Sequence, residues 1–197
     1  MTVMLVVAAL ATSWSSYQAT RWNGEQAAAA GRTNGIRIDA ARADGLARSQ
    51  TQVDVATFIA WADADQRGET KVADFYEARF RDEFRTAFDA WLATKPLTNT
   101  DAAPTPFAMD EYQVASKAEA EKLDAAAEAS AAEVRIDIQR SSNYVLTVVL
   151  YAVVLFFAGV STRFQNRRLR WVLSIAGCVV LLAALCWVAT FPVSLAV

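Results

Sequence analysis

The sequence predicts an all-α membrane protein, and three observations support this fold class. The 197-residue chain contains three long uncharged segments, and about 20 mostly apolar residues are enough to cross a bilayer as a helix. The region between the first two segments is rich in Ala, Arg, Glu, Asp and Gln and shows no strand-like alternation. A stretch of 52 residues without Gly or Pro then runs into the second segment. We therefore expect three transmembrane helices plus an extracytoplasmic helical domain, with one long helix continuous into the second span.

The uncharged segments set the expected boundaries. Residues 1–20 form the first span, residues 141–162 the second and residues 171–197 the third. The first span is the weakest, because polar residues fill its second half from Thr12 to Gln18. A cleaved signal peptide is the alternative for this segment, although no basic residue precedes its apolar run. A native start upstream of Met1 also stays open.

The basic residues predict the topology of the chain in the membrane. The turn between the second and third spans, residues 163–170, carries four Arg and no acidic residue, and short basic loops of this kind stay in the cytoplasm. Residues 21–140 hold the other 15 basic residues and all 21 acidic residues. We expect the N-terminus inside, and residues 21–140 and the C-terminus outside. The residues that set this topology, or contact anionic lipid headgroups, are Arg163, Arg167, Arg168 and Arg170.

Residues 21–140 should contain three helical regions and one loop. Aromatic residues recur at three- and four-residue steps between Lys71 and Leu92, which predicts one helix whose stripe forms the core of the outer domain. A partner-binding face is the alternative. Residues 21–65 form another helical region, in which Gly31 to Gly35 is either a break or a close-packing site. The long helix begins near Met109, and three prolines predict an exposed loop over residues 94–107.

The segment from Asp63 to Asp74 has the spacing of a calcium-binding EF-hand loop, with acids at four ligand positions and Gly68 at the turn. The acids are Asp63, Asp65, Glu69 and Asp74. However, Arg67 stands where the loop needs a ligand. We therefore interpret the segment as a helix–turn–helix corner, in which Gly68 turns the chain and Thr70 caps the next helix. No metal or other cofactor is predicted.

The residue types argue against catalysis. The chain contains no His, the commonest general base and metal ligand. Cys178 and Cys186 are eight residues apart in an apolar run, too far along a helix for a disulfide. The adjacent acids Asp82 and Glu83 diverge by about 100° on a helix, and with nearby Arg residues they should form a solvated ion-pair face. We find no phosphate-binding loop or nucleophile motif, so we expect neither an enzyme nor a nucleic-acid partner.

The second half of the first span is the most informative local feature. Its polar side chains would be costly against lipid, so protein should enclose this helix. Small residues at four-residue steps let helices approach closely, and at an oligomer axis the same face could line a pore. The packing or pore-lining residues are Ala8, Thr12, Ser13, Ser16 and Gln18. Just outside the membrane, we expect a structural clasp made of the ion pairs Arg21–Asp137 and Glu25–Arg140.

The order of these parts resembles an uncharacterised bacterial inner-membrane family of unknown function, whose members have one N-terminal span, an outer helical insert and a closing two-span hairpin. The resemblance rests on Trp14-Ser15-Ser16-Tyr17-Gln18-Ala19 and on residues 141–170. It implies a location in the bacterial inner membrane, and the family supplies no activity to transfer.

The functional expectation is a non-enzymatic membrane protein that acts by assembly. It would be a homo-oligomeric scaffold or an accessory subunit of a larger complex, with the bilayer, itself or other membrane subunits as partners. One alternative is an oligomeric channel lined by the polar face of the first span. The other is an extracytoplasmic sensor or ligand-binding module, which would need exposed aromatic residues or a cavity between the outer helices.

Overall fold

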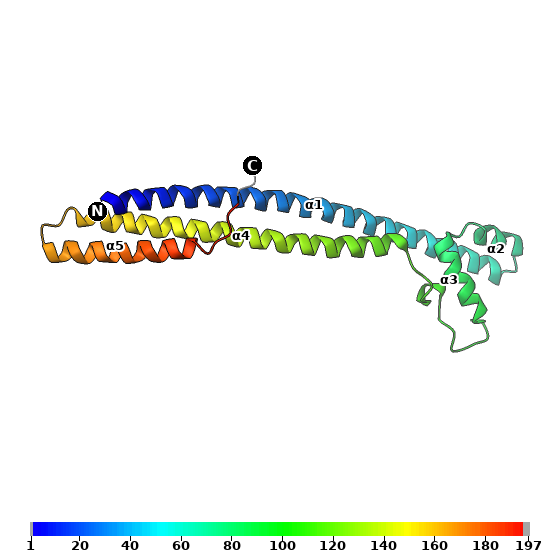
Figure 1. The fold of residues 1–197 in the computed structure, drawn as a ribbon. Coiled ribbons are helices and arrows are strands. Elements are labelled where there is room, and N and C mark those ends of the chain that lie inside the picture. The colour runs from blue at the N-terminus through cyan, green and yellow to red at the C-terminus, as the bar shows by residue number, and fades with distance from the viewer. Residues whose placement is uncertain (1, 195–197) are drawn as a thin grey trace. The chain divides into compact units, whose positions relative to one another are not determined.

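The computed structural model describes residues 2–194, and all regular structure in that range is helical. The elements in chain order are α1 (Thr2–Gln66), α2 (Thr70–Glu77), α3 (Asp82–Ala93), the short 3-10 helix η1 (Pro106–Ala108), α4 (Ala115–Ser161) and α5 (Arg167–Val188) (Figure 1). The prediction of an all-α fold is confirmed. Met1, at the start of the first predicted span, and residues 195–197, at the end of the third, lie outside the described range.

Two of the described helices, α4 and α5, are long and apolar enough to cross a membrane. Helix α1 does not reach the same hydropathy, because the polar residues from Thr12 to Gln18 follow its apolar start. Composition therefore identifies two candidate spans among the described residues, and the first predicted span has to be argued from its packing.

The chain divides into two compact units. The bundle unit comprises residues 2–33 and 128–194 of the described range, and the aromatic unit comprises residues 34–127. Helices α1 and α4 each contribute a segment to both units.

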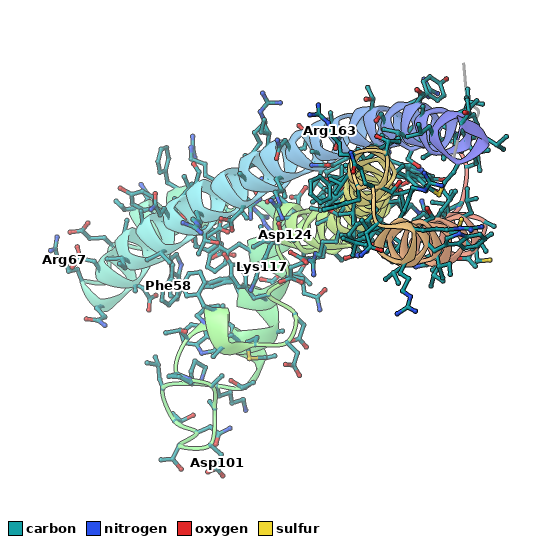
Figure 2. The ribbon with its side chains drawn as sticks, turned by 90° about the vertical axis from the view of Figure 1, so that its left-hand side faces the viewer. Phe58, Arg67, Asp101, Lys117, Asp124 and Arg163 are labelled. Atoms are coloured by element: carbon teal, nitrogen blue, oxygen red, sulfur yellow. The ribbon has the colours of Figure 1, made fainter. Side chains whose placement is uncertain are left out.

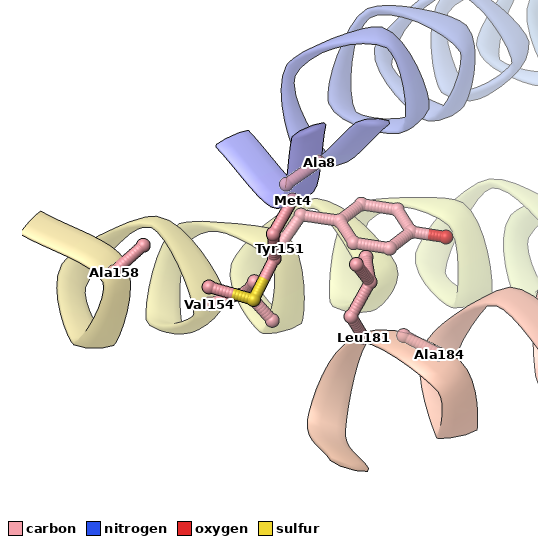
Figure 3. Close-up of a cluster of buried hydrophobic side chains, with 7 residues drawn as sticks. All are labelled: Met4, Ala8, Tyr151, Val154, Ala158, Leu181 and Ala184. Atoms are coloured by element: carbon pink, nitrogen blue, oxygen red, sulfur yellow. The ribbon is translucent and has the colours of Figure 1, made fainter. Parts of the chain in front are cut away.

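In the bundle unit, the first part of α1 runs antiparallel to the second part of α4, and α5 lies beside them (Figure 1). The Thr33 and Ser130 hydroxyls are 2.7 Å apart, and Ser141 donates to the carbonyl of Ala19 at 3.2 Å. A cluster of buried side chains joins all three helices (Figure 3). Its members are Met4, Ala8, Tyr151, Val154, Ala158, Leu181 and Ala184. Three of these seven are alanines, so the helix backbones approach closely here.

The chain after α5 is bound to α1 and α4 through backbone groups. Trp22 Nε1 and the Tyr144 hydroxyl donate to the carbonyl of Pro192 at 3.3 and 3.0 Å. Gln18 forms two hydrogen bonds with the backbone of Ser194. Its Nε2 donates to the carbonyl at 3.4 Å, and its Oε1 accepts from the N–H at 3.1 Å. The buried amide of Gln18 is therefore satisfied by a segment 176 residues away in the chain.

In the aromatic unit, the second part of α1 packs with α2, α3 and η1 around a core of rings. Phe84 and Phe88 are fully buried, and Phe58 of α1 makes edge contacts to both. The rest of the core comprises Trp61, Ala64, Ala73, Phe80 and Trp91, with Phe107 and Tyr112 packed against it. The aromatic stripe is therefore the core of this unit, as its spacing predicts, and Phe80, Phe84 and Trp91 do not form an exposed face.

The prediction of a single helix from Lys71 to Leu92 is wrong, because the helix is interrupted between the end of α2 and the start of α3. Arg81 takes an extended conformation at the start of α3 (ψ 148°), which directs its side chain to Asp54 on α1. The acids of the first turn of α3 then favour the new helix start through the helix dipole. The aromatic stripe is divided by this break, and Phe75 on α2 stays 50% exposed.

Helix α1 continues through Gly31 and Gly35 without a break, which excludes one of the two alternatives for this segment. The start of the long helix differs from the prediction. Helix α4 begins at Ala115 and not near Met109. The 3-10 helix η1 and the non-helical residues 109–114 precede it. The carboxylate of Glu83 accepts a hydrogen bond from the backbone N–H of Ala115 at 3.2 Å, which satisfies a free donor at the helix start. From there α4 runs unbroken to Ser161, as expected for a helix entering the second predicted span.

Candidate functional site

The calcium-like segment forms the corner between α1 and α2. Gly68 has a left-handed backbone (φ 72°), and its N–H donates to the Asp65 carbonyl at 2.9 Å. Asp63 pairs with Arg67 at 2.9 Å. Among residues 2–194, no group of three or more acidic or Cys side chains is arranged to hold a metal ion. The structure thus has the predicted turn at Gly68, but α2 starts at Thr70 with Glu69 as the capping position, so Thr70 is not the cap.

The packing residues predicted in the first span fall on two faces of α1. Ala8 and Gln18 are fully buried and Thr12 is half-buried, whereas Ser13 and Ser16 are exposed. The side chains that do face α4 and α5 follow three- and four-residue steps from Met4. They are Met4, Ala8, Ala11, Ser15, Gln18 and Trp22. The buried face therefore includes Ala8 but is turned away from Ser13 and Ser16.

The membrane-surface clasp differs from the predicted pairs. Arg140 pairs with Asp137 of its own helix at 3.0 Å, and its guanidinium lies 4.5 Å from the centre of a Trp22 ring. Neither Arg21–Asp137 nor Glu25–Arg140 is among the ion pairs of the described residues. The helices are joined here by Ser141, whose hydroxyl lies near both Ala19 and Asn23 of α1.

The four arginines of residues 163–170 are exposed. Arg163 precedes α5, and the other three lie in the first turn of α5. The side chain of Asn166 accepts a hydrogen bond from the backbone N–H of Arg168 at 3.0 Å, and so caps the start of α5. The cysteines of α5 are free thiols, and Cys178 Sγ lies 3.5 Å from Met4 Sδ.

A buried ion pair in the aromatic unit is absent from the sequence prediction. Asp54 is 1% exposed and accepts two hydrogen bonds from the Arg81 guanidinium, both at 3.0 Å. The Tyr112 hydroxyl donates to the same carboxylate at 3.0 Å, and Glu83 pairs with Arg81 at 2.8 Å. The network joins α1, the start of α3 and the segment before α4, so it fixes how these elements pack.

The electrostatics of this network follow from its geometry. The hydrogen bond to Asp54 raises the pKa of Arg81 above its usual value, so the guanidinium is charged at any ordinary pH. Burial raises the pKa of the Tyr112 hydroxyl, with the Asp54 charge acting in the same direction. A sequence signal for this site did exist, because Asp54 lies four and seven residues before the core rings of Phe58 and Trp61. An acid on a core-facing stripe requires a partner.

The aromatic unit also contains a groove of about 870 Å³. The last turns of α1 and α3 and the loop after α3 form its walls. Its lining residues are Phe58, Trp61, Ala62, Asp65, Gln66, Trp91, Leu92, Lys95, Pro96, Leu97, Thr98 and Pro104. Trp91 is held in place by a 2.8 Å hydrogen bond from its indole N–H to the carbonyl of Ala103. Figure 2 shows Phe58 on α1 and Asp101 at the far end of the loop.

The rim of this groove has a strained residue. Lys95 has a positive φ of 53°, a conformation that costs a residue with a side chain about 1–2 kcal/mol. Its backbone N–H donates to the carbonyl of Leu92 at the end of α3, and its carbonyl accepts from the N–H of Thr98 in the loop, at 3.0 Å each. The strain is therefore maintained by the fold of the loop, which places the side chain of Lys95 at the groove.

Comparison with known protein families, with curated proteins and with solved structures finds no match for this chain. The described residues themselves therefore carry any functional inference.

Proposed function

We propose that the protein crosses a bacterial inner membrane three times and acts by assembling with further copies of itself, without catalysis. The observation that best supports membrane insertion is the polarity of the bundle unit. Ser15, Gln18 and Thr147 are fully buried there, whereas Val3, Leu10 and Phe156 are 77%, 67% and 63% exposed. Lipid can cover such apolar side chains at no cost, whereas water cannot.

The exposed apolar side chains occur on all three helices of the bundle unit. On α1 they are Val3, Val6 and Leu10; on α4, Val145, Leu146, Val149, Val153 and Phe156; on α5, Trp171, Val172, Ile175, Val179 and Leu182. Met4 and Ala8 share one cluster with the two apolar helices. This shared cluster favours membrane insertion of the start of α1 together with α4 and α5.

Three polar side chains of the proposed first span, Thr12, Ser13 and Gln18, have hydrogen-bond partners within the protein. Thr12 and Ser13 donate to the carbonyls four residues earlier, at 2.7 and 3.0 Å. Gln18 bonds to the backbone of Ser194. These bonds reduce the cost of polar side chains in a bilayer. The bond pattern of Gln18 also favours a packing role over a pore-lining role.

The proposed orientation rests on the four exposed arginines of residues 163–170. A short loop with this charge is retained in the cytoplasm. The N-terminus would then also be cytoplasmic, and the aromatic unit would lie outside.

Assembly is supported by the glycines of α1. At Gly24, Gly31, Gly35 and Gly45, an added Cβ would meet no neighbouring atom within 4 Å, so packing within the described part of the chain does not require glycine. Each glycine in a helix interior costs about 0.5–1 kcal/mol relative to Ala. Gly24, Gly31 and Gly35 lie on one face at 100° per residue, opposite the side facing α4. A closely approaching helix from a second copy would use this space.

Native mass spectrometry of the full chain, released gently from its membrane, tests the proposal. We expect a symmetric multiple of one chain. A single-chain mass would contradict self-assembly, and a mass explained only by other polypeptides would favour an accessory subunit instead.

A substitution pair separates assembly from folding. Replacing Gly24 and Gly31 with Leu should abolish the multimer while raising the helix propensity of α1. The matched control is Ala41→Leu, an exposed change on a different face of the same helix, which should leave the multimer intact. A double variant that stays multimeric would contradict the role of the glycine face.

A further inference from the structure

We propose that the groove of the aromatic unit binds a small zwitterion with an apolar body, with the chemistry of a short peptide of apolar residues that has free ends. The inference concerns a site within one unit, and it rests neither on membrane insertion nor on self-assembly. It gives physical content to the ligand-binding alternative, which requires a cavity between the outer helices.

The floor of the groove is apolar and rigid. Phe58 lies 5.9 Å from Trp61 and 5.6 Å from Trp91, measured between ring centres. The ring of Phe88 packs edge-on against Trp61, with ring centres 4.7 Å apart. The indole N–H of Trp91 already donates to the carbonyl of Ala103. The rings therefore offer mainly apolar surface, which suits an aliphatic or aromatic side chain.

The rim of the groove carries one charge of each sign. Asp65 comes from the last turn of α1, and Lys95 follows the end of α3. Neither forms an ion pair within the described residues, whereas the neighbouring Asp63 pairs with Arg67. A ligand with an ammonium group and a carboxylate would pair with both.

The charges at the rim and the volume of the groove together restrict the class of ligand that fits. A purely cationic or purely anionic apolar molecule would pair with one rim charge and lie near a like charge at the other. The volume of about 870 Å³ lies near the upper end of the range of roughly 300–1,000 Å³ for small-molecule pockets. A single amino acid would leave much of it empty, whereas a peptide of two or three apolar residues fills it better.

Isothermal titration calorimetry on the full chain in detergent tests the proposal with leucyl-leucine as the probe. We expect measurable binding. Blocking the amine by acetylation, or the carboxylate as an amide, should each weaken binding about fivefold, the effect of one exposed ion pair at its upper limit.

Variants assign each end of the peptide. In Asp65→Asn, leucyl-leucine and its acetylated form should bind equally weakly, while the amide still loses affinity. In Lys95→Gln, the pattern should reverse. Asp101→Asn is the matched control, because Asp101 is an exposed acid of the same loop that does not line the groove, and it should bind as the unaltered chain does.

Two outcomes would overturn the proposal. One is that no binding of leucyl-leucine is detected at millimolar concentration in a chain whose thermal unfolding is normal. The other is equal binding of the free and blocked peptides, which would show that the rim charges do not recognise the ligand.

Discussion

The two units of the chain differ in the side chains that they bury and expose. In the bundle unit, hydroxyls and an amide are buried beside small apolar residues, while Val, Leu and Phe side chains are exposed. In the aromatic unit, rings fill the core, and charged residues share the surface with apolar ones such as Leu97 and Ile59. The aromatic unit has the pattern of a protein that folds in water, where burying apolar surface is the main driving force. The bundle unit has the pattern expected where lipid surrounds the helices.

The units also differ in what specifies their packing. Small residues and hydrogen bonds between helices hold the bundle unit, as at Ala8, Ala158 and Ser141. The aromatic unit instead has a buried ion pair, Asp54 with Arg81. A charge pair of this kind is costly to bury and costly to break, so it fixes one arrangement of α1 and α3. The predictions below test this contrast, beginning with the largest expected effect.

Removing the buried carboxylate should destabilise the aromatic unit strongly. Asp54→Ala removes the buried partner of the Arg81 guanidinium, leaving it only Glu83, and removes the acceptor of the Tyr112 hydroxyl. The free energy of unfolding should fall by about 3–5 kcal/mol. Denaturant unfolding followed by Trp fluorescence measures this loss. The control is Asp44→Ala, which breaks the exposed pair with Arg48 and should cost only about 0.3–0.5 kcal/mol. Equal losses in the two variants would mean that the buried pair does not hold the unit together.

Replacing the buried amide of the bundle unit should have a smaller effect. Gln18→Leu removes both bonds to Ser194 and leaves backbone groups unpaired, so stability in detergent should fall by about 1–2 kcal/mol. Ser16→Leu, on the exposed face of the same helix turn, should be neutral or stabilising if that face contacts lipid or detergent. Thermal unfolding of the two variants compares them. A greater loss for Ser16→Leu would contradict the reversed polarity of this unit.

Alkaline pH should weaken the aromatic unit through Tyr112. Because folding raises the pKa of this hydroxyl, the folded state holds its proton more tightly than the unfolded state. The stabilising contribution is complete below the unfolded pKa of about 10, and it is lost as pH rises through the folded value. Tyr112→Phe cannot titrate, so its unfolding free energy should fall less between neutral and strongly alkaline pH. Parallel pH profiles of the two chains would count against this prediction.

The smallest effect is expected at the strained rim of the groove. Lys95→Gly removes the side chain that disfavours a positive φ and should raise stability by about 0.5 kcal/mol, the net of relieved strain and added freedom in the unfolded chain. Lys95→Val should lower stability, because a β-branched residue tolerates this conformation poorly. Thermal unfolding ranks the three chains, and a rank order with Gly lowest would show that the loop does not hold this backbone in the folded chain.

Local patterns in the sequence predict much of the fold. The spacing of rings between Lys71 and Leu92 identifies the core of the aromatic unit, and Gly68 identifies the corner after α1. Both depend on neighbours a few residues apart. The break at Arg81 was missed because it depends on Asp54, which is 27 residues away.

The candidate site was less predictable for the same reason. The pairing of Gln18 with Ser194 spans 176 residues, and no local rule indicates it. The predicted pairs of Arg21 and Glu25 assumed that the two helices are neighbours with these groups at one height, whereas Arg140 pairs with Asp137 on its own helix. The groove draws its walls from three separate segments, so only the folded chain shows it. The resemblance to an inner-membrane family remains a prediction.

The central claim is that the bundle unit lies in a membrane with the aromatic unit outside it. Labelling of single cysteines in intact cells with a membrane-impermeant thiol reagent tests it most directly, in a chain with Cys178 and Cys186 replaced by Ser. Asp101→Cys in the aromatic unit should be labelled from outside, and Gln165→Cys in the basic turn only after the inner membrane is opened. Labelling of Gln165→Cys in intact cells with protection of Asp101→Cys would contradict the proposed orientation, and recovery of the chain in the soluble fraction would contradict membrane insertion itself.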